Sequence, residues 1–309
     1  MQTAHRIRHP RFEQMVDLRR TLHRHPELAF QEEETARRII EQLDTLGIGY
    51  EYGGVGTGVV GRLEGGPTGG PVVALRAEMD ALPGEETTGL PFASEHPGRM
   101  HACGHDAHMA MVLGAAATLL EAPPAGDVVF VFQPAEEKGG GARTVLESGS
   151  IDDVEAIFAL HVTHHYDVGE LMVKQGVVTA QSDGFSVEIR GAGGHGARPH
   201  EAIDAVIIAG AFINTIQTIV SRKIDPLHPS VITIGRVEAG SAPNVIAETA
   251  HLEGTFRTTR PAAREQIERG IRQTARALGE LHDAEVAVEI REGYPPVRNT
   301  AREAEWARE

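Results

Sequence analysis

The sequence predicts an α/β protein in two parts, a sheet covered by helices on both faces and a smaller α+β sandwich. Its 309 residues are more than one compact core usually holds. Up to about residue 183, apolar runs typical of buried strands alternate with helical patterns, which indicates a sheet between helices. Beyond that point the order of elements changes, so we place a domain boundary there.

The first part begins with two helices. Apolar residues at helical spacing predict helices over 12–28 and 33–46, which we expect to end at Pro26 and Gly47 respectively. Closely spaced glycines in 53–66 then punctuate short strands. Compact apolar runs, typical of buried strands, follow at 71–75, 127–132 and 157–160, with a helix predicted over 107–120.

The second part has the order strand, helix, strand, strand, helix, strand. The strands are predicted at 185–189, 231–237, 250–257 and 286–290, and the helices at 203–220 and 262–281. This βαββαβ order predicts a ferredoxin-like sandwich.

Composition narrows the class of function. The chain has 29 basic and 44 acidic residues, and its formal net charge of -15 argues against a nucleic-acid partner. No run of about 18 apolar residues occurs, so we expect no membrane span. The stretch Met1–Pro10 has no apolar core of a signal peptide, which predicts a cytoplasmic location.

Three polar clusters follow predicted strands or open predicted helices. They are Cys103, His105, Asp106 and His108; Glu136 and Glu137; and His161. Sites in open α/β sheets form beyond the carboxyl ends of strands, so these loops could converge. Thiolate, imidazole and carboxylate together suit zinc, manganese, cobalt or iron better than calcium or magnesium.

The adjacent carboxylates Glu136 and Glu137 offer two roles, one binding metal while the other moves a proton. A metal lowers the pKa of bound water, and a nearby carboxylate completes its deprotonation, as amide hydrolysis requires. Each residue also has a plainer explanation. A Glu-Glu pair is usually solvated at a helix start, and a lone histidine such as His161 is more often a satisfied core residue. The combination of three loops favours the metal site.

The second part adds two candidates. His195 lies in a glycine-dense stretch whose backbone could let it approach a ligand closely. Arg257, at a strand end, could clamp a carboxylate through two hydrogen bonds. The plainer alternatives are a strand-to-helix turn and a surface arginine.

Together these motifs resemble the M20 metallopeptidases, and within them the branch of hippurate hydrolases, N-acetyl-diaminopimelate deacetylases and auxin-conjugate hydrolases. The stretches that carry the resemblance are 22–28, 76–83, 100–108, 133–137, 193–195 and 242–246. The resemblance implies a catalytic sheet domain with an inserted lid and dimerisation domain, and hydrolysis of N-acyl amino acids.

The resemblance also implies a centre of two divalent ions, manganese or zinc. Cys103 would bridge the two ions, with His105, Glu137 and His161 as further ligands. Glu136 would be the general base that acts on a metal-activated water and then protonates the leaving amine.

Four more residues receive roles from the same resemblance. Asp80 would orient a ligand, and His195 would reach across a dimer interface to stabilise the oxyanion. Asn244 and Arg257 would hold the free carboxylate of a small N-acyl amino acid. The expected assembly is a homodimer through the lid.

The chain departs from the branch at Glu78, where aspartate is usual, and at Ala247, where proline is usual. Family chains return to the catalytic domain for roughly another 80 residues after the lid, so we expect a truncated C-terminus. The predicted segments are 1–183 for the metal-binding catalytic domain, 184–293 for the lid and 294–309 for the start of the return.

Two alternatives stay open. The chain could be an inactive fragment or pseudoenzyme that keeps only a dimerising lid. It could also be a hydrolase that uses Cys103 as nucleophile with His105 as base.

Overall fold

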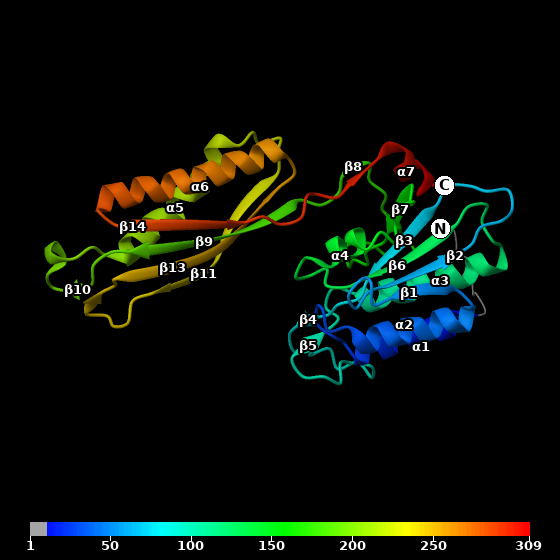
Figure 1. The fold of residues 1–309 in the computed structure, drawn as a ribbon. Coiled ribbons are helices and arrows are strands. Elements are labelled where there is room, and N and C mark those ends of the chain that lie inside the picture. The colour runs from blue at the N-terminus through cyan, green and yellow to red at the C-terminus, as the bar shows by residue number, and fades with distance from the viewer. Residues whose placement is uncertain (1–10) are drawn as a thin grey trace. The chain divides into compact units, whose positions relative to one another are not determined.

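The computed structural model describes residues 11–309, and their contacts form two compact units that divide between Leu171 and Met172 (Figure 1). The stretch Met1–Pro10, on which the prediction about a signal peptide falls, lies outside the described residues.

The first unit is built on a five-stranded sheet in the order β1-β2-β6-β3-β7. Its strands are β1 (Gly49–Tyr52), β2 (Val59–Leu63), β3 (Val73–Glu78), β6 (Val128–Gln133) and β7 (Ala156–Ala159). The strands β6, β3 and β7 run parallel, whereas β1 and β2 are antiparallel to their neighbours. The carboxyl ends of the three parallel strands therefore meet at one edge, where a site is expected.

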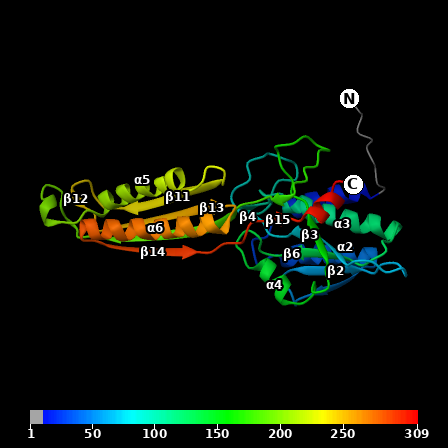
Figure 2. The same ribbon diagram turned by 90° about the horizontal axis from the view of Figure 1, so that it is seen from above.

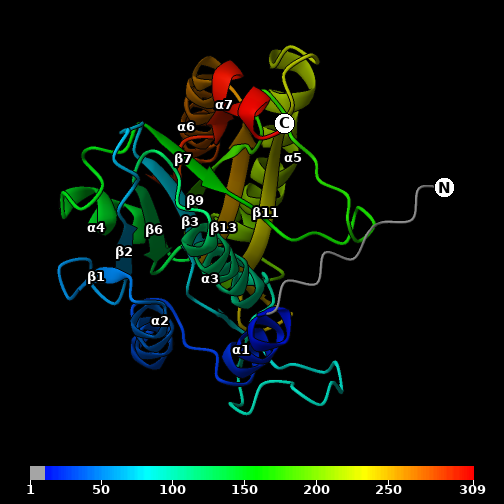
Figure 3. The same ribbon diagram turned by 90° about the vertical axis from the view of Figure 1, so that its right-hand side faces the viewer.

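Helices cover both faces of this sheet, as predicted (Figure 3). The helices are α1 (Phe12–Arg24), α2 (Glu33–Leu46), α3 (His105–Glu121) and α4 (Gly141–Glu147). Strand β6 shows the two-sided burial: Phe130 and Phe132 pack with α1, α2 and α3, while Val129 and Val131 pack with α4. Successive side chains of a strand point to opposite faces, so a continuous apolar run forms a strand buried on both sides.

The second unit contains the predicted ferredoxin-like sandwich (Figure 2). Its elements are β9 (Gln181–Arg190), α5 (Ala205–Lys223), β11 (Ser230–Ala239), β13 (Thr249–Thr258), α6 (Pro261–His282) and β14 (Glu285–Arg291). The four strands form an antiparallel sheet in the order β11-β13-β9-β14. Both helices bury their apolar residues against one face of this sheet.

The division between the units falls earlier than the predicted boundary at 183. Strand β8 (Gly176–Val177) pairs with β15 (Arg298–Asn299), which ties the segment before β9 to the segment after β14. By contacts, residues 294–309, including α7 (Ala301–Trp306), therefore group with the second unit.

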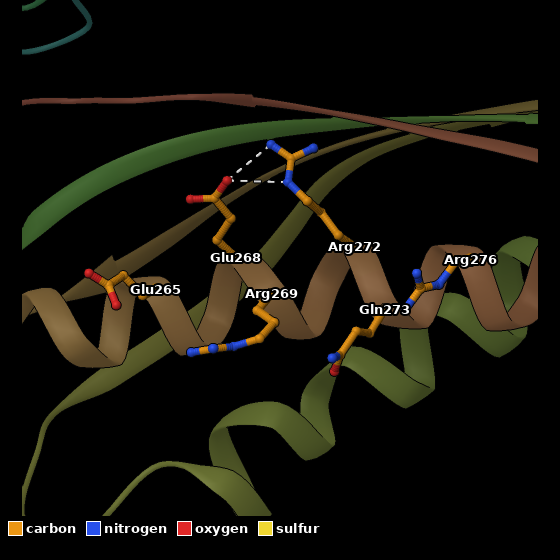
Figure 4. A pocket seen from close by; sticks show the side chains of 6 residues that line it. All are labelled: Glu265, Glu268, Arg269, Arg272, Gln273 and Arg276. Atoms are coloured by element: carbon orange, nitrogen blue, oxygen red, sulfur yellow. Dashed lines mark hydrogen bonds and ion pairs between the residues drawn. The ribbon is translucent and has the colours of Figure 1, made fainter.

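The two helices of the sandwich differ in what they expose. Helix α6 presents a charged surface with a shallow hollow, lined by Glu265, Glu268, Arg269, Arg272, Gln273 and Arg276 (Figure 4). Glu268 and Arg272 form an ion pair of 3.0 Å along that surface. Helix α5 has no charged residue between Ala205 and Ser221, and it exposes Val206 and Ile207. Among the described helices, α5 is long and apolar enough to cross a membrane by length and composition alone.

Candidate metal centre

The three loops singled out from the sequence converge at the carboxyl edge of the first unit's sheet. Ligand atoms of Cys103, His105 and His161 lie within 4.8 Å of one another, and so do those of His105, Glu136 and Glu137. The two groups share His105. The structure does not place Cys103 and Glu137 in one such group, so the bridging role of Cys103 stays a prediction.

His105 is the first residue of α3 and follows Gly104, which takes the left-handed φ of 86° that favours glycine. Its Nδ1 donates to the backbone carbonyl of Asp80 at 2.7 Å, which leaves Nε2 free to bind an ion. Burial lowers the pKa of His105, but Asp80 and then Cys103 raise it to about 11.

Cys103 and His161 face each other across the edge. The distance from Sγ to Nε2 is 3.3 Å. His161 Nδ1 donates to the carbonyl of Val162 at 2.7 Å, so its Nε2 keeps the lone pair that points to Cys103. With metal bonds of about 2.3 Å to sulfur and about 2.1 Å to nitrogen, both atoms can reach one ion. The donor set therefore fits a divalent transition metal.

The turn that carries Glu136 and Glu137 is held by a buried carboxylate. Asp80 is 1% exposed, and its two oxygens accept the backbone N–H groups of Glu136 and Glu137 at 3.0 Å each. Burial, then the charge of Glu137, raise the pKa of Glu136. A raised pKa makes Glu136 a stronger proton acceptor, as a general base requires.

One group that supports this turn is not recognisable from the sequence. Ala135 adopts a left-handed φ of 49°, a strained conformation for a residue with a side chain. Its N–H donates at 2.8 Å to Glu32, a fully buried carboxylate that also accepts from the hydroxyl of Thr57. In the sequence Glu32 begins a run of three glutamates that resembles a solvated helix start, so only burial distinguishes it.

Asp106, a member of the first polar cluster, does not join either group of ligand atoms. Its Oδ2 accepts from His23 Nδ1 at 2.8 Å and pairs with Arg19 at 2.7 Å. These contacts tie the start of α3 to α1, so Asp106 holds the helix that presents His105.

The candidates of the second unit lie in two places. His195 is exposed on β10 (Gly194–His195), and Gly196 donates its N–H to the carbonyl of Asn244 at 2.9 Å. Arg257 is exposed on β13, where it donates to the hydroxyl of Thr255 at 2.9 Å. It lies eight residues beyond the start of β13 at Thr249, which corresponds to roughly 26 Å of strand. One sandwich brings His195 and Asn244 together but not Arg257.

Known proteins resemble this chain over most of its length. A family model described as peptidase family M20/M25/M40 matches residues 74–309. The N-acetylcysteine deacetylase of Bacillus subtilis is 41% identical over 292 residues, which are 92% of this chain and 76% of that protein. An N-acetyldiaminopimelate deacetylase of Listeria monocytogenes is 40% identical over 296 residues, 94% of this chain and 79% of the relative.

Solved structures agree with the sequence comparisons. A dinuclear metal binding peptidase from the M20 family, from Bacillus subtilis, has a TM-score of 0.79 and 38% identity. The match covers 94% of this chain and 76% of that one.

Proposed function

The chain belongs to peptidase family M20/M25/M40, and on this premise we propose that it hydrolyses the amide bond of N-acyl amino acids with two divalent metal ions, manganese or zinc. The names of relatives that act on N-acetylcysteine and N-acetyldiaminopimelate support this substrate class. A structural relative described as dinuclear supports two ions. The convergence of the ligand atoms within 4.8 Å is the observation that carries the proposal.

The ligands in the proposal are Cys103, His105, Glu137 and His161. Bound ions would polarise the scissile carbonyl and make water more acidic. Glu136 then takes one proton from water as the oxygen attacks the carbonyl carbon. It passes that proton to the nitrogen as the carbon–nitrogen bond breaks, which yields a carboxylic acid and an amine. Asp80 positions Glu136 through its backbone N–H.

The lid supplies the substrate contacts. His195 would stabilise the oxyanion, and Asn244 and Arg257 would hold the free carboxylate. Asn244 lies beside His195 in one lid, whereas Arg257 lies far along β13. A single carboxylate would therefore meet both residues only if they come from different subunits, which agrees with the predicted reach of His195 across a dimer.

We extend the proposal to a homodimer through the lid. The uncharged exposed surface of α5 contrasts with the charged surface of α6, and β11 is an edge strand of the same sheet. Interface cores are depleted in charged residues, so we propose that α5 and β11 form the dimer interface. Sedimentation of the wild-type chain should give a dimer, and Ile207→Glu should shift it toward the monomer. An unchanged assembly in Ile207→Glu would exclude α5.

Hydrolysis of a panel of N-acetyl amino acids, including N-acetylcysteine, tests the reaction. We expect release of the amine with manganese or zinc, loss with a chelator and recovery when metal is restored. Activity that survives complete chelation would instead support Cys103 as nucleophile. The reading as an inactive fragment is not favoured, because relatives matched over most of the chain are named as deacetylases.

A further inference from the structure

We propose that His108 is a positioning residue that holds His161 in place through the backbone N–H of Val162, and that Glu78 fixes its tautomer. The inference rests on the proposed function, because it takes His161 to be a metal ligand. It concerns a histidine and a glutamate to which the proposed reaction gives no role.

The hydrogen bonds of His108 define its protonation. The side chain is 1% exposed, and its Nε2 lies 3.0 Å from the backbone nitrogen of Val162. A backbone N–H can only donate, so Nε2 must carry a lone pair and the ring proton must sit on Nδ1. Nδ1 then donates to the carboxylate of Glu78 at 2.7 Å. His108 is the neutral Nδ1–H tautomer in this arrangement.

This arrangement excludes another role for the same residues. Ligand atoms of Glu78, His105 and His108 lie within 4.8 Å of one another, close enough to suggest a separate metal site. Both ring nitrogens of His108 are occupied, one by Val162 and one by Glu78. His108 has no lone pair left for an ion while these bonds stand, so it supports the centre from outside.

Glu78 is itself fixed. Its other oxygen accepts from Arg76 Nη1 at 2.6 Å, and Arg76 Nε donates to the side chain of Gln133 at 2.7 Å. Gln133 ends β6, Glu78 ends β3, and Val162 follows β7. The chain of hydrogen bonds therefore runs across the carboxyl ends of the three strands that present the site.

The last hydrogen bond of this network, from Val162 to His108, holds the loop that carries His161. His161 and Val162 are both exposed, but Val162 also contacts the loop of Cys103: a Cβ on Gly104 would lie 2.4 Å from Val162 Cγ2. The ring of His161 meets that of His108 edge to face, with centroids 4.7 Å apart. Fixing Val162 thus fixes the neighbouring imidazole relative to Cys103.

Two substitutions of His108 separate its two hydrogen bonds. His108→Asn keeps a donor near the position of Nδ1 but has nothing at Nε2 to accept from Val162. His108→Gln places a carbonyl oxygen near Nε2 and can accept that N–H. Groups that orient metal ligands typically contribute about 10–100-fold to affinity. We expect the manganese Kd of the full chain to rise about 10–100-fold in His108→Asn, with most of the affinity kept in His108→Gln.

The matched control is His165→Gln, which changes an exposed histidine of the same loop and should leave the manganese Kd unchanged. Equal affinity in wild type and His108→Asn, with manganese bound by both, overturns the inference and leaves the proposed function standing. Absence of manganese binding and of hydrolysis in the wild type overturns the proposed function and the inference with it.

A measurement on the wild type keeps the inference testable if His108→Asn does not fold. Nitrogen NMR of the chain with 15N-labelled histidine, loaded with zinc, reports which ring nitrogen of His108 carries the proton. In this zinc-loaded sample, we expect Nδ1 of His108 to carry the proton. We expect Nε2 of His108 to carry neither a proton nor a zinc ion. A proton on Nε2, or zinc bound to His108, contradicts the inference.

Discussion

The two units hold their candidate residues in opposite ways. In the first unit, buried Asp80 holds the ring of His105 and the backbone of Glu136 and Glu137. Two more buried side chains hold neighbours of the site, since Glu32 bonds Ala135 and His108 bonds Val162. In the second, His195 and Arg257 are exposed and make only local hydrogen bonds. Preorganised groups suit chemistry, whereas exposed groups suit contacts that form when substrate arrives. We therefore expect variants of the first unit to change metal binding or proton transfer. Variants of the lid should change kcat or KM and leave the metal affinity unchanged.

The largest effect is expected for Glu136→Gln. The amide cannot take up the proton of water, so kcat should fall by about 10²–10⁴ while the metal content stays that of the wild type. Steady-state kinetics and elemental analysis of the same preparation check both. Lys138→Gln, an exposed neighbour on the same turn, is the matched control. Full activity in Glu136→Gln would show that Glu136 is not the general base.

His195→Ala should have the next largest effect. Loss of one donor to an oxyanion lowers kcat by about 10²–10³. Because His195 lies in the lid, the manganese Kd should not change, which separates this variant from those of the first unit. His200→Ala, an exposed histidine of the same unit, serves as control. A weakened manganese Kd in His195→Ala would break the contrast between the units.

Arg257→Ala should act mainly on KM. A hydrogen bond to a charged group contributes about 1.5–3 kcal/mol, which corresponds to roughly a 10–100-fold rise in KM. For substrates whose carboxylate is converted to an amide, the KM of Arg257→Ala should equal that of the wild type. The same rise in KM for carboxylate and amide substrates would show that Arg257 does not bind the carboxylate.

The smallest effect concerns stability and pH. Burial raises the pKa of Glu78, but the hydrogen bond from His108 and the charge of Arg76 outweigh it and lower the pKa to about 2. The ionised carboxyl therefore stabilises the fold fully above its ordinary pKa of 4.5, and this stabilisation is lost as the pH falls toward 2.

Urea unfolding of the metal-free chain measures this effect. The difference in free energy of unfolding between wild type and Glu78→Gln should narrow by about 1–2 kcal/mol from about pH 5.5 to about pH 3.5. A difference that stays constant over this range would mean that Glu78 is not held in its ionised form.

Patterns that repeat along the chain were predictable from sequence. Helix α2 was predicted at Glu33–Leu46, because its apolar residues recur at helical spacing and Gly47 ends it in a left-handed conformation. The order of the sandwich followed from alternating strand and helix patterns. Helix α4 was not predicted, because it has only 7 residues and begins at a glycine.

The candidate site was also only partly predictable from the sequence. The metal-binding residue types were recognisable because they cluster in short motifs. The supporting group Glu32 was not recognisable, and His108 was recognised only as a member of the first polar cluster, without its supporting role. Each acts on a residue far away in the chain: Glu32 on Ala135, and His108 on Val162. A carboxylate in a charged run has the same local sequence whether it is solvated or buried. Only the tertiary fold distinguishes the two.

The central claim is that the edge of the first unit's sheet is a metal centre. Manganese content after loading and desalting, compared between the wild-type chain and Cys103→Ala, tests it most directly. The account predicts bound manganese in the wild type and a clear loss in Cys103→Ala, whose ligand atom faces His161 at 3.3 Å in the wild type. Equal manganese content in the two proteins would contradict it.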